Sequence, residues 1–297
     1  MKKADRNALV AFPVVVLVGA VIALAGSQGG AKAGGFPVFA LCVALAFVIQ
    51  WLAFIPAYLL QTEGFYDLTG SLTYLTVTIV AVALGPTPDA RSWVLLTLVV
   101  VWAVRLGSYL FTRIRKVGKD DRFDAIKPSF IRFLNAWTLQ ALWVSITLGA
   151  ALAAITTNVR KGFGVLAVIG LLVWLAGFAL EATADLQKSR FRADPANRGR
   201  FIHTGVWAWS RHPNYFGEIT LWVGVALIAV PVLHGWQWAT LVSPVFVFLL
   251  LTRVSGVPLL EKKADTKWGG QPDYEAYKKR TPVLVPRPPA RSPEPPT

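Results

Sequence analysis

The residues best suited to chemistry lie in the segment Ser-Arg-His-Pro-Asn-Tyr-Phe-Gly-Glu, which ends at Glu218. Pro213 suits the first turn of a helix, where its missing N–H leaves no hydrogen bond unmade. The backbone amides at such a helix start, with Arg211 and His212 beside them, would form an anion site. Asn214 and Glu218 are four residues apart and share a helical face, and the glycine before Glu218 would let another helix or a ligand approach closely. A capping turn is the simpler alternative, but it explains only Pro213.

A second group of charged residues follows one face of a predicted helix. The spacing i, i+4, i+7 and i+11 puts four side chains on that face: Glu181, Asp185, Lys188 and Arg192. The first of these residues lies within an apolar stretch, and the later ones lie beyond its end. A solvated helix end explains the two basic residues, but it explains Glu181 less well.

Few ionisable residues lie in or beside the apolar stretches, and they are functional candidates because a charge is costly in lipid. Arg105 lies inside one stretch and Asp67 just before another. With both termini in the cytoplasm, as the distribution of lysine and arginine predicts, they fall in the cytoplasmic half of the membrane, as do Glu181, Asp185 and Glu218. This predicts a polar cavity that opens to the cytoplasm, and it argues against an ion path through the bilayer. A structural ion pair between Arg105 and a carboxylate is the alternative.

The elements that must position these residues are membrane-spanning helices. Apolar residues make up 55% of the 297-residue chain and charged residues 15%, whereas a soluble domain has roughly 25% charged residues. Apolar runs approach the roughly 20 residues that cross a bilayer, and the alternating pattern of a membrane barrel is absent. We therefore predict an all-α polytopic bundle of about seven to eight transmembrane helices. The apolar runs are 8–26, 36–60, 68–85, 92–113, 130–156, 162–184, 215–233 and 237–252.

Lysine and arginine are unevenly shared between the predicted sides of the membrane. Of the 30, 25 fall in the amino terminus, the loops after even-numbered spans and the tail, and four fall in the other loops. The positive-inside rule then predicts that both termini are cytoplasmic. The net charge of +14 is interpreted as a surface facing anionic lipids, of which a few residues could bind a phosphate-bearing ligand. The first apolar run is too long for a cleaved secretory signal, so we predict a retained helix.

Other features exclude further classes of protein. Cys42 is the only cysteine and the three histidines are scattered, so we predict neither a disulfide framework nor a metal site. No internal repeat supports a transporter built from inverted halves. We predict one membrane-embedded domain over residues 1–281 and a proline-rich, extended and disordered tail over residues 282–297.

Two tyrosines follow the last span on a predicted short helix. Tyr274 and Tyr277 are three residues apart and so share a face. They could pack on the cytoplasmic end of the bundle, because tyrosine is common at membrane interfaces. They could also stack on the base of a ligand.

These motifs together resemble the steroid 5-alpha-reductase family, and more closely its bacterial relatives catalogued as a domain of unknown function. The resemblance covers residues 105–286. It implies an enzyme that uses NADPH to reduce a carbon–carbon double bond conjugated to a carbonyl in a steroid-like or other lipid. It also implies a bacterial inner-membrane protein with its active site facing the cytoplasm. The implied partners are the lipid substrate and membrane lipids, with no nucleic acid and no obligate protein partner.

The resemblance also implies roles for individual residues. Asn214 and Glu218 match the pair that holds the nicotinamide end of the cofactor. Asp185 matches an aspartate that binds a ribose, and two arginines eight residues apart match a phosphate-binding pair. The residues assigned to NADPH in this way are Arg105, Asp185, Arg192, Arg200, Arg211, His212, Asn214, Tyr215, Glu218, Arg253 and Tyr274.

One departure concerns the substrate half of the site. The steroid enzymes polarise the substrate ketone with a tyrosine and a glutamate, and the tyrosine position is Trp102 here. An indole donates one hydrogen bond and is a poor acid. Another tyrosine with a nearby carboxylate would then have to donate to the carbonyl oxygen. The predicted catalytic residues are Tyr66, Tyr109, Glu63, Asp67 and Glu218.

Two other functions stay open at this point. Isoprenylcysteine carboxyl methyltransferases, which use S-adenosylmethionine, share the Arg-His-Pro-x-Tyr-x-Gly segment and a tail in which a glutamate precedes Tyr-x-x-Tyr and a proline. Asn214 and Glu218, with the arginines assigned to phosphates, favour a reductase. A membrane scaffold or lipid-binding protein could also keep the fold without any activity. The clustered charges argue against a scaffold, since their cost in a membrane suggests a use.

Overall fold

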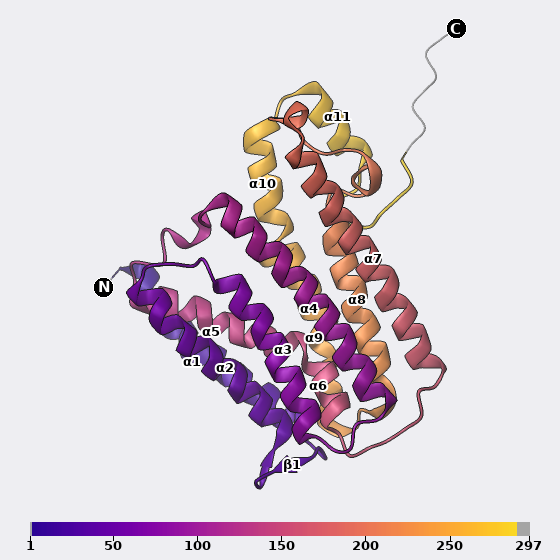
Figure 1. Cartoon of the computed structure of the whole chain (residues 1–297). Coiled ribbons are helices and arrows are strands. Elements are labelled where there is room, and N and C mark those ends of the chain that lie inside the picture. The colour runs from indigo at the N-terminus through magenta and orange to yellow at the C-terminus, as the bar shows by residue number, and fades with distance from the viewer. Residues whose placement is uncertain (1, 290–297) are drawn as a thin grey trace. The chain divides into compact units, whose positions relative to one another are not determined.

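The computed structural model describes residues 2–289, and most of its regular structure is helical (Figure 1). The main elements in chain order are α1 (Lys3–Gly26), β1 (Lys32–Ala33), β2 (Phe36–Pro37), α2 (Val38–Leu59), α3 (Tyr66–Leu84), α4 (Ala90–Val117), α5 (Phe130–Thr147), α6 (Gly149–Thr156), α7 (Val165–Ala193), α8 (Pro213–Ala229), η5 (Gly235–Leu241), α9 (Val242–Leu249), η6 (Leu250–Val254), α10 (Val257–Trp268) and α11 (Pro272–Arg280).

Seven helical stretches in the described residues are long and apolar enough to cross a membrane, and the bent pair α5 and α6 would make eight. This confirms the predicted all-α polytopic bundle and supports an integral membrane protein. Two helices extend past the apolar runs that predicted them, because each continues with charged residues: α4 ends at Val117 and α7 at Ala193. The side of the membrane on which each terminus lies stays a prediction.

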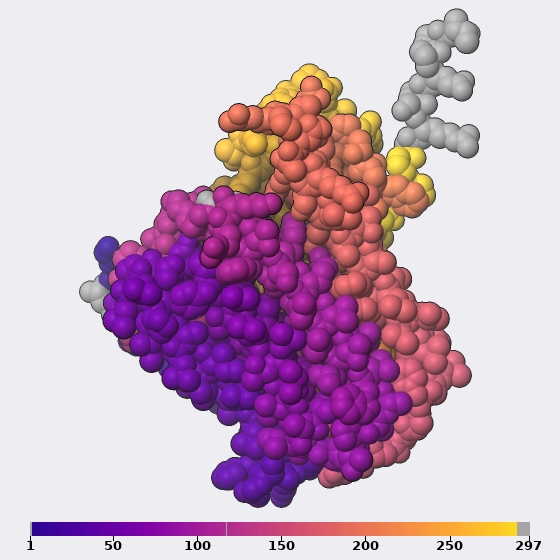
Figure 2. Space-filling view, viewed as in Figure 1, coloured from indigo at the N-terminus to yellow at the C-terminus, as the bar shows by residue number. Residues whose placement is uncertain are grey.

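The described residues divide into two compact units. Unit 1 lies within Met1–Val168 and Val225–Ser243, and unit 2 within Ile169–Gly224 and Pro244–Thr297. The predicted domain over residues 1–281 therefore contains two units. In unit 1, α2 packs against α3 and α5, and α3 packs against α4. The hairpin of β1 and β2 projects from unit 1 (Figures 1 and 2).

The span predicted over residues 130–156 is not one straight helix. Its two halves, α5 and α6, meet at 55°. The carbonyl oxygen of Thr147 accepts a hydrogen bond from Ser243 Oγ at 2.5 Å, and Gly149 packs beside Thr240. Every residue of α6 is buried. Hydropathy reports the apolar length of this segment, but the bend depends on residues about 90 positions further along the chain.

A buried arginine ties three segments of unit 1 together. Arg91 is 1% exposed. Its guanidinium donates to the carbonyl oxygens of Ile228 at 2.9 Å, Lys161 at 2.8 Å and Gly162 at 3.0 Å. The rigid fork of donors on arginine suits several acceptors at once. Arg91 therefore joins the start of α4 to the end of α8 and to the loop before α7.

The start of the predicted tail is held in place within unit 2. We name residues 282–287 the C-terminal strap, because they are hydrogen bonded to the segment before α8. The pairs are Arg211 N–H with Pro282 O (2.9 Å), Arg287 N–H with Trp209 O (2.9 Å) and Ser210 Oγ with Leu284 O (2.8 Å). The structure thus differs from the predicted disorder over the strap, because composition does not register backbone pairing. Residues 290–297 lie outside the described residues.

Candidate functional site

The backbones of α7 and α8 touch at glycines in unit 2, where the two helices run side by side (Figure 1). A Cβ atom added to Gly177 would lie 2.6 Å from the carbonyl oxygen of Gly217, and one added to Gly217 would lie 2.6 Å from that of Gly177. Seven residues further along α8, a Cβ on Gly224 would lie 2.6 Å from the carbonyl oxygen of Gly170. Small residues allow such close approach. The close contact predicted at Gly217 is therefore with another helix.

This contact brings together the two charged groups that the sequence singled out. A Cβ on Gly217 would lie 3.0 Å from Cβ of Glu181, so Glu181 lies beside the turn of α8 that carries Asn214 and Glu218. Asn214 Nδ2 donates to Asp185 Oδ1 at 3.4 Å. Glu181 and Asp185 are 2% and 5% exposed. We call Glu181, Asp185, Asn214 and Glu218 the α7–α8 polar cluster.

The start of α8 is organised by a carboxylate to which the sequence analysis assigned no role. Glu261, on α10, has Oε1 2.8 Å from His212 Nε2 and Oε2 2.6 Å from Arg211 Nη1. The His212 ring lies parallel to that of Tyr215, with 9° between the planes and 5.7 Å between the centroids. The anion predicted beside Arg211 and His212 is thus supplied within the protein. No spacing rule links Glu261 to His212, 49 positions earlier, so the sequence did not indicate this pairing.

The electrostatic environment favours a neutral His212. The side chain is 4% exposed, and burial lowers the pKa of His212 because it disfavours the charged imidazolium. The Glu261 carboxylate opposes this shift, whereas the positive charges of Lys188 and Arg211 add to it. The net effect is a lowered pKa, so His212 is uncharged at neutral pH.

Three of the arginines assigned to the cofactor are exposed side chains of unit 2: Arg192, Arg200 and Arg253. Arg192 lies in the last turn of α7, and Arg200 lies in the loop that follows. This loop is fixed to the C-terminal helices, since Trp268 Nε1 donates to the Gly199 carbonyl oxygen at 2.6 Å. Arg253 lies in the π-helical turn η6. Exposed guanidinium groups on an anchored loop are suited to phosphate binding.

Tyr274 and Tyr277 pack against the rest of unit 2, which is the first of the two alternatives. Both are buried. Tyr274 donates its hydroxyl to Asp265 Oδ1 at 3.1 Å, and Tyr277 donates to the Trp207 carbonyl oxygen at 2.7 Å. Burial raises the pKa of both phenols. The cofactor role of Tyr274 stays a prediction.

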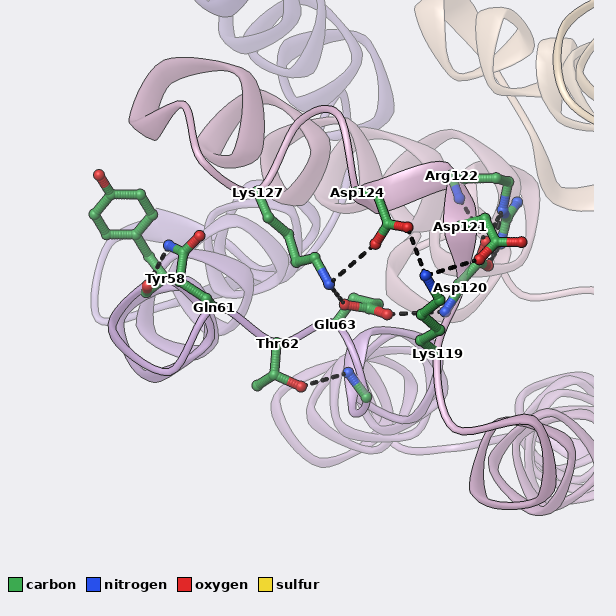
Figure 3. A network of polar contacts seen from close by, with 11 residues as sticks. Tyr58, Gln61, Thr62, Glu63, Lys119, Asp120, Asp121, Arg122, Asp124 and Lys127 are labelled. Atoms are coloured by element: carbon green, nitrogen blue, oxygen red, sulfur yellow. Dashed lines mark hydrogen bonds and ion pairs between the residues drawn. The ribbon is translucent and has the colours of Figure 1, made fainter.

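Three of the predicted catalytic residues, Glu63, Tyr66 and Asp67, lie close together in unit 1, and each of them makes a structural contact. Glu63 is 5% exposed, and its carboxylate accepts from the Asp120 N–H at 2.8 Å and from Lys127 Nζ at 2.5 Å (Figure 3). Tyr66 donates its hydroxyl to the Ala136 carbonyl oxygen at 2.9 Å. The Asp67 carboxylate lies 3.6 Å from Arg113 Nη2. All three residues line one small cavity, together with Gly64, Ile114, Asp120 and Phe123.

The loop that bears Lys127 carries further ion pairs (Figure 3). Arg122 pairs with Asp120, and Lys119 pairs with Asp124. Burial alone would raise the pKa of Asp120, but the Arg122 hydrogen bonds and charge outweigh it and lower that pKa. Glu63 therefore joins the connection between α2 and α3 to this charged loop, which suits an anchoring role.

The remaining predicted residues lie on α4. Arg105 and Tyr109 are four residues apart on this helix and are partly exposed within unit 1. Trp102 is buried, and its ring meets that of Tyr74 edge to face with centroids 5.0 Å apart. The indole of Trp102, which stands where the steroid enzymes have a tyrosine, therefore packs between α3 and α4. Of the two tyrosines predicted for catalysis, Tyr109 is the more exposed, since Tyr66 is buried.

The fold and these residues define a polytopic helical membrane protein with buried polar groups near the ends of its helices. A family model described as "Protein of unknown function (DUF1295)" matches residues 53–281, and the chain belongs to this family. It is also 27% identical over 191 residues to the "Uncharacterized protein C594.04c" of Schizosaccharomyces pombe. That match covers 56% of this chain and 53% of the relative, so the chain spans about half the length of that protein. No solved structure matches the chain.

Proposed function

We propose that this protein is an integral-membrane, NADPH-dependent reductase of a carbon–carbon double bond conjugated to a carbonyl in a lipid. The observation that carries the proposal is the α7–α8 polar cluster, in which Glu181 and Asp185 are almost fully buried beside Asn214. Buried carboxylates on membrane helices are costly and usually functional. The loose relation of the family to steroid-reductase-like proteins supports the same class of reaction.

The residues present fit a nicotinamide nucleotide. Asn214 Oδ1 is buried and accepts no hydrogen bond within the described part of the chain, and the same holds for His212 Nδ1. Buried acceptors of this kind normally have partners, and the amide and hydroxyl groups of such a nucleotide are donors. Arg192 and Arg200 are exposed in the same unit and suit phosphate groups.

In this proposal, NADPH supplies the hydride when it is bound. Asn214 and Glu218 orient the carboxamide, and Asp185 orients Asn214. Tyr109 donates a hydrogen bond to the substrate carbonyl oxygen. The resemblance assigns Arg105 to the cofactor as well.

The test is ligand binding to the detergent-purified protein by thermal shift, with NADPH, NADH and S-adenosylmethionine compared. A ligand that binds only the folded state raises its apparent stability. We expect a shift with NADPH, and about tenfold or more weaker binding in Arg192→Ala and Arg200→Ala, since each removes a charge-assisted contact. Arg198→Ala is the matched control, because Arg198 is another exposed arginine of the same loop.

Two results would overturn the proposal. A shift with S-adenosylmethionine alone would indicate a methyltransferase of the isoprenylcysteine type. No shift with any of the three, together with unchanged lipid binding in Glu218→Gln, would indicate a lipid-binding or scaffold protein. If NADPH binds, oxidation of NADPH in the presence of enone lipids tests the reaction itself.

A further inference from the structure

The hydrogen-bonding chemistry of Glu261 determines where His212 carries its proton. An ionised carboxylate can only accept hydrogen bonds. Glu261 Oε1 lies 2.8 Å from His212 Nε2, while Oε2 is occupied by Arg211 Nη1 at 2.6 Å. A contact at 2.8 Å between Nε2 and this oxygen requires a proton on Nε2. The pair therefore selects the tautomer in which Nε2 is the donor.

The rest of the surroundings fix the ring and leave its other nitrogen without a partner. The ring stacks on Tyr215, and the backbone N–H of His212 donates to Ser210 Oγ at 3.1 Å. His212 Nδ1 is buried and makes no hydrogen bond within residues 2–289. A buried nitrogen lone pair with no donor is unfavourable. Because the ring is held in place, Nδ1 is suited to accept a hydrogen bond from a donor group of a bound ligand.

The charged groups that face the ring come from three segments. Glu261 lies on α10, Lys188 on α7, and Arg211 directly before the histidine. Burial lowers the pKa of His212, the Glu261 carboxylate opposes this shift, and the two cations add to it. A neutral ring with its proton on Nε2 has a lone pair on Nδ1. The lowered pKa is therefore consistent with the tautomer that the contact with Glu261 selects.

We propose that Glu261 is a positioning residue, which holds His212 in the Nε2–H tautomer so that Nδ1 accepts a hydrogen bond from an N–H or O–H group of the bound nucleotide. The identity of the ligand rests on the proposed function, whereas the tautomer rests on the geometry of unit 2. An acceptor at this point recognises an amide or a hydroxyl, and it would repel a phosphate oxygen. His212 therefore binds an uncharged part of the nucleotide, and the exposed arginines bind its phosphates.

The tautomer can be read directly, because the chain has three histidines. Protein labelled with 15N-histidine in detergent should give one protonated and one unprotonated ring nitrogen for His212, and the signals are assigned by their loss in His212→Gln. The Nδ1 signal should move when NADPH is added to saturation. NADPH affinity should fall as pH is lowered through the pKa of His212, since a protonated Nδ1 cannot accept.

Glu261→Gln tests the positioning role. A glutamine amide can donate to Nε2 and so permits the other tautomer, in which Nδ1 carries the proton. We expect an altered Nδ1 signal and about tenfold or more weaker NADPH binding. Glu275→Gln is the matched control, because it makes the same chemical change in unit 2 at a carboxylate whose partner is the Gly270 N–H. The control should stay within about twofold of the wild type, because that contact is exposed.

Several outcomes separate this inference from the proposed function. A protonated Nδ1 in the wild-type protein without ligand would overturn the tautomer, even if Glu261→Gln failed to fold. A thermal shift with NADPH that leaves the Nδ1 signal unmoved would overturn the acceptor role while the proposed function stood. No shift with NADPH would overturn the proposed function and the nucleotide as ligand, and the labelled protein would still report the tautomer.

Discussion

Gly177 and Gly217 face each other so closely that a Cβ atom on either would lie 2.6 Å from the carbonyl oxygen of the other. This contact sets the depth at which Glu181 meets α8, since Glu181 is one turn along α7 from Gly177. The two helices therefore share a site because glycine lets their backbones touch.

Gly177→Ala should destabilise the protein and weaken ligand binding together. The added methyl group must separate α7 from α8, and overpacking of this kind costs about 1–3 kcal/mol. Thermal unfolding in detergent measures the first effect, and the NADPH thermal shift measures the second. Gly164→Ala is the control, because a Cβ there meets nothing within 4 Å. Equal unfolding temperatures for the two variants would contradict the close contact.

The pair formed by Glu63 and Lys127 should act as an anchor for the loop before α5. Both side chains are largely buried, so removing one partner leaves a buried charge, at a cost of about 3–5 kcal/mol. Glu63→Gln should therefore speed tryptic cleavage after Lys119 and Arg122. The double variant Glu63→Gln with Lys127→Met should recover part of the loss, because no charge is left unpaired.

The measurement distinguishes this role from the catalytic one predicted from the sequence. A structural Glu63 gives a double variant that resists trypsin better than the single variant and keeps NADPH-dependent turnover. A catalytic Glu63 gives two variants that are equally inactive, whatever their resistance to trypsin. Lys116→Met changes an exposed lysine in the last turn of α4 and leaves the two measured cleavage sites intact, so it controls for the loss of positive charge.

Features that depend on residues close together in the chain could be predicted from the sequence, whereas features that depend on distant partners could not. The lengths of the apolar runs predicted the membrane-spanning helices, because hydropathy is a property of each residue alone. The face shared by Glu181 and Asp185 followed from helical periodicity in the same way. The bend between α5 and α6 depends on Ser243, and the state of His212 depends on Glu261. Such partners lie far away in the chain, so no pattern within a single segment could reveal them.

The stability of the protein should depend on pH through His212. Because its folded pKa lies below the ordinary value of 6.5, the unfolded chain takes up the proton first as pH falls. The free energy of unfolding should therefore decrease as pH drops below about 6.5, and level off below the folded pKa. His212→Gln should flatten this part of the profile, measured as unfolding temperature from about pH 7.5 to about pH 5. An unchanged slope in the variant would show that other groups cause it.

The C-terminal strap should stabilise the segment that leads into α8. Its removal would leave the Arg211 N–H and the Ser210 hydroxyl without the carbonyl oxygens of Pro282 and Leu284. Each lost hydrogen bond costs about 0.5–1.5 kcal/mol. A chain that ends at Thr281 should thus unfold at a lower temperature than the wild type, and it should bind NADPH more weakly because Arg211 and His212 adjoin the strap.

A second truncation makes this prediction specific. A chain that ends at Pro289 keeps the whole strap, so it should unfold at a higher temperature than the chain that ends at Thr281 and bind NADPH more tightly. Ser210→Ala removes a hydroxyl that donates to the strap and accepts from the His212 N–H, so it should also unfold at a lower temperature than the chain that ends at Pro289. If the chain ending at Thr281 matched the chain ending at Pro289 in both measurements, the strap would contribute nothing to the start of α8.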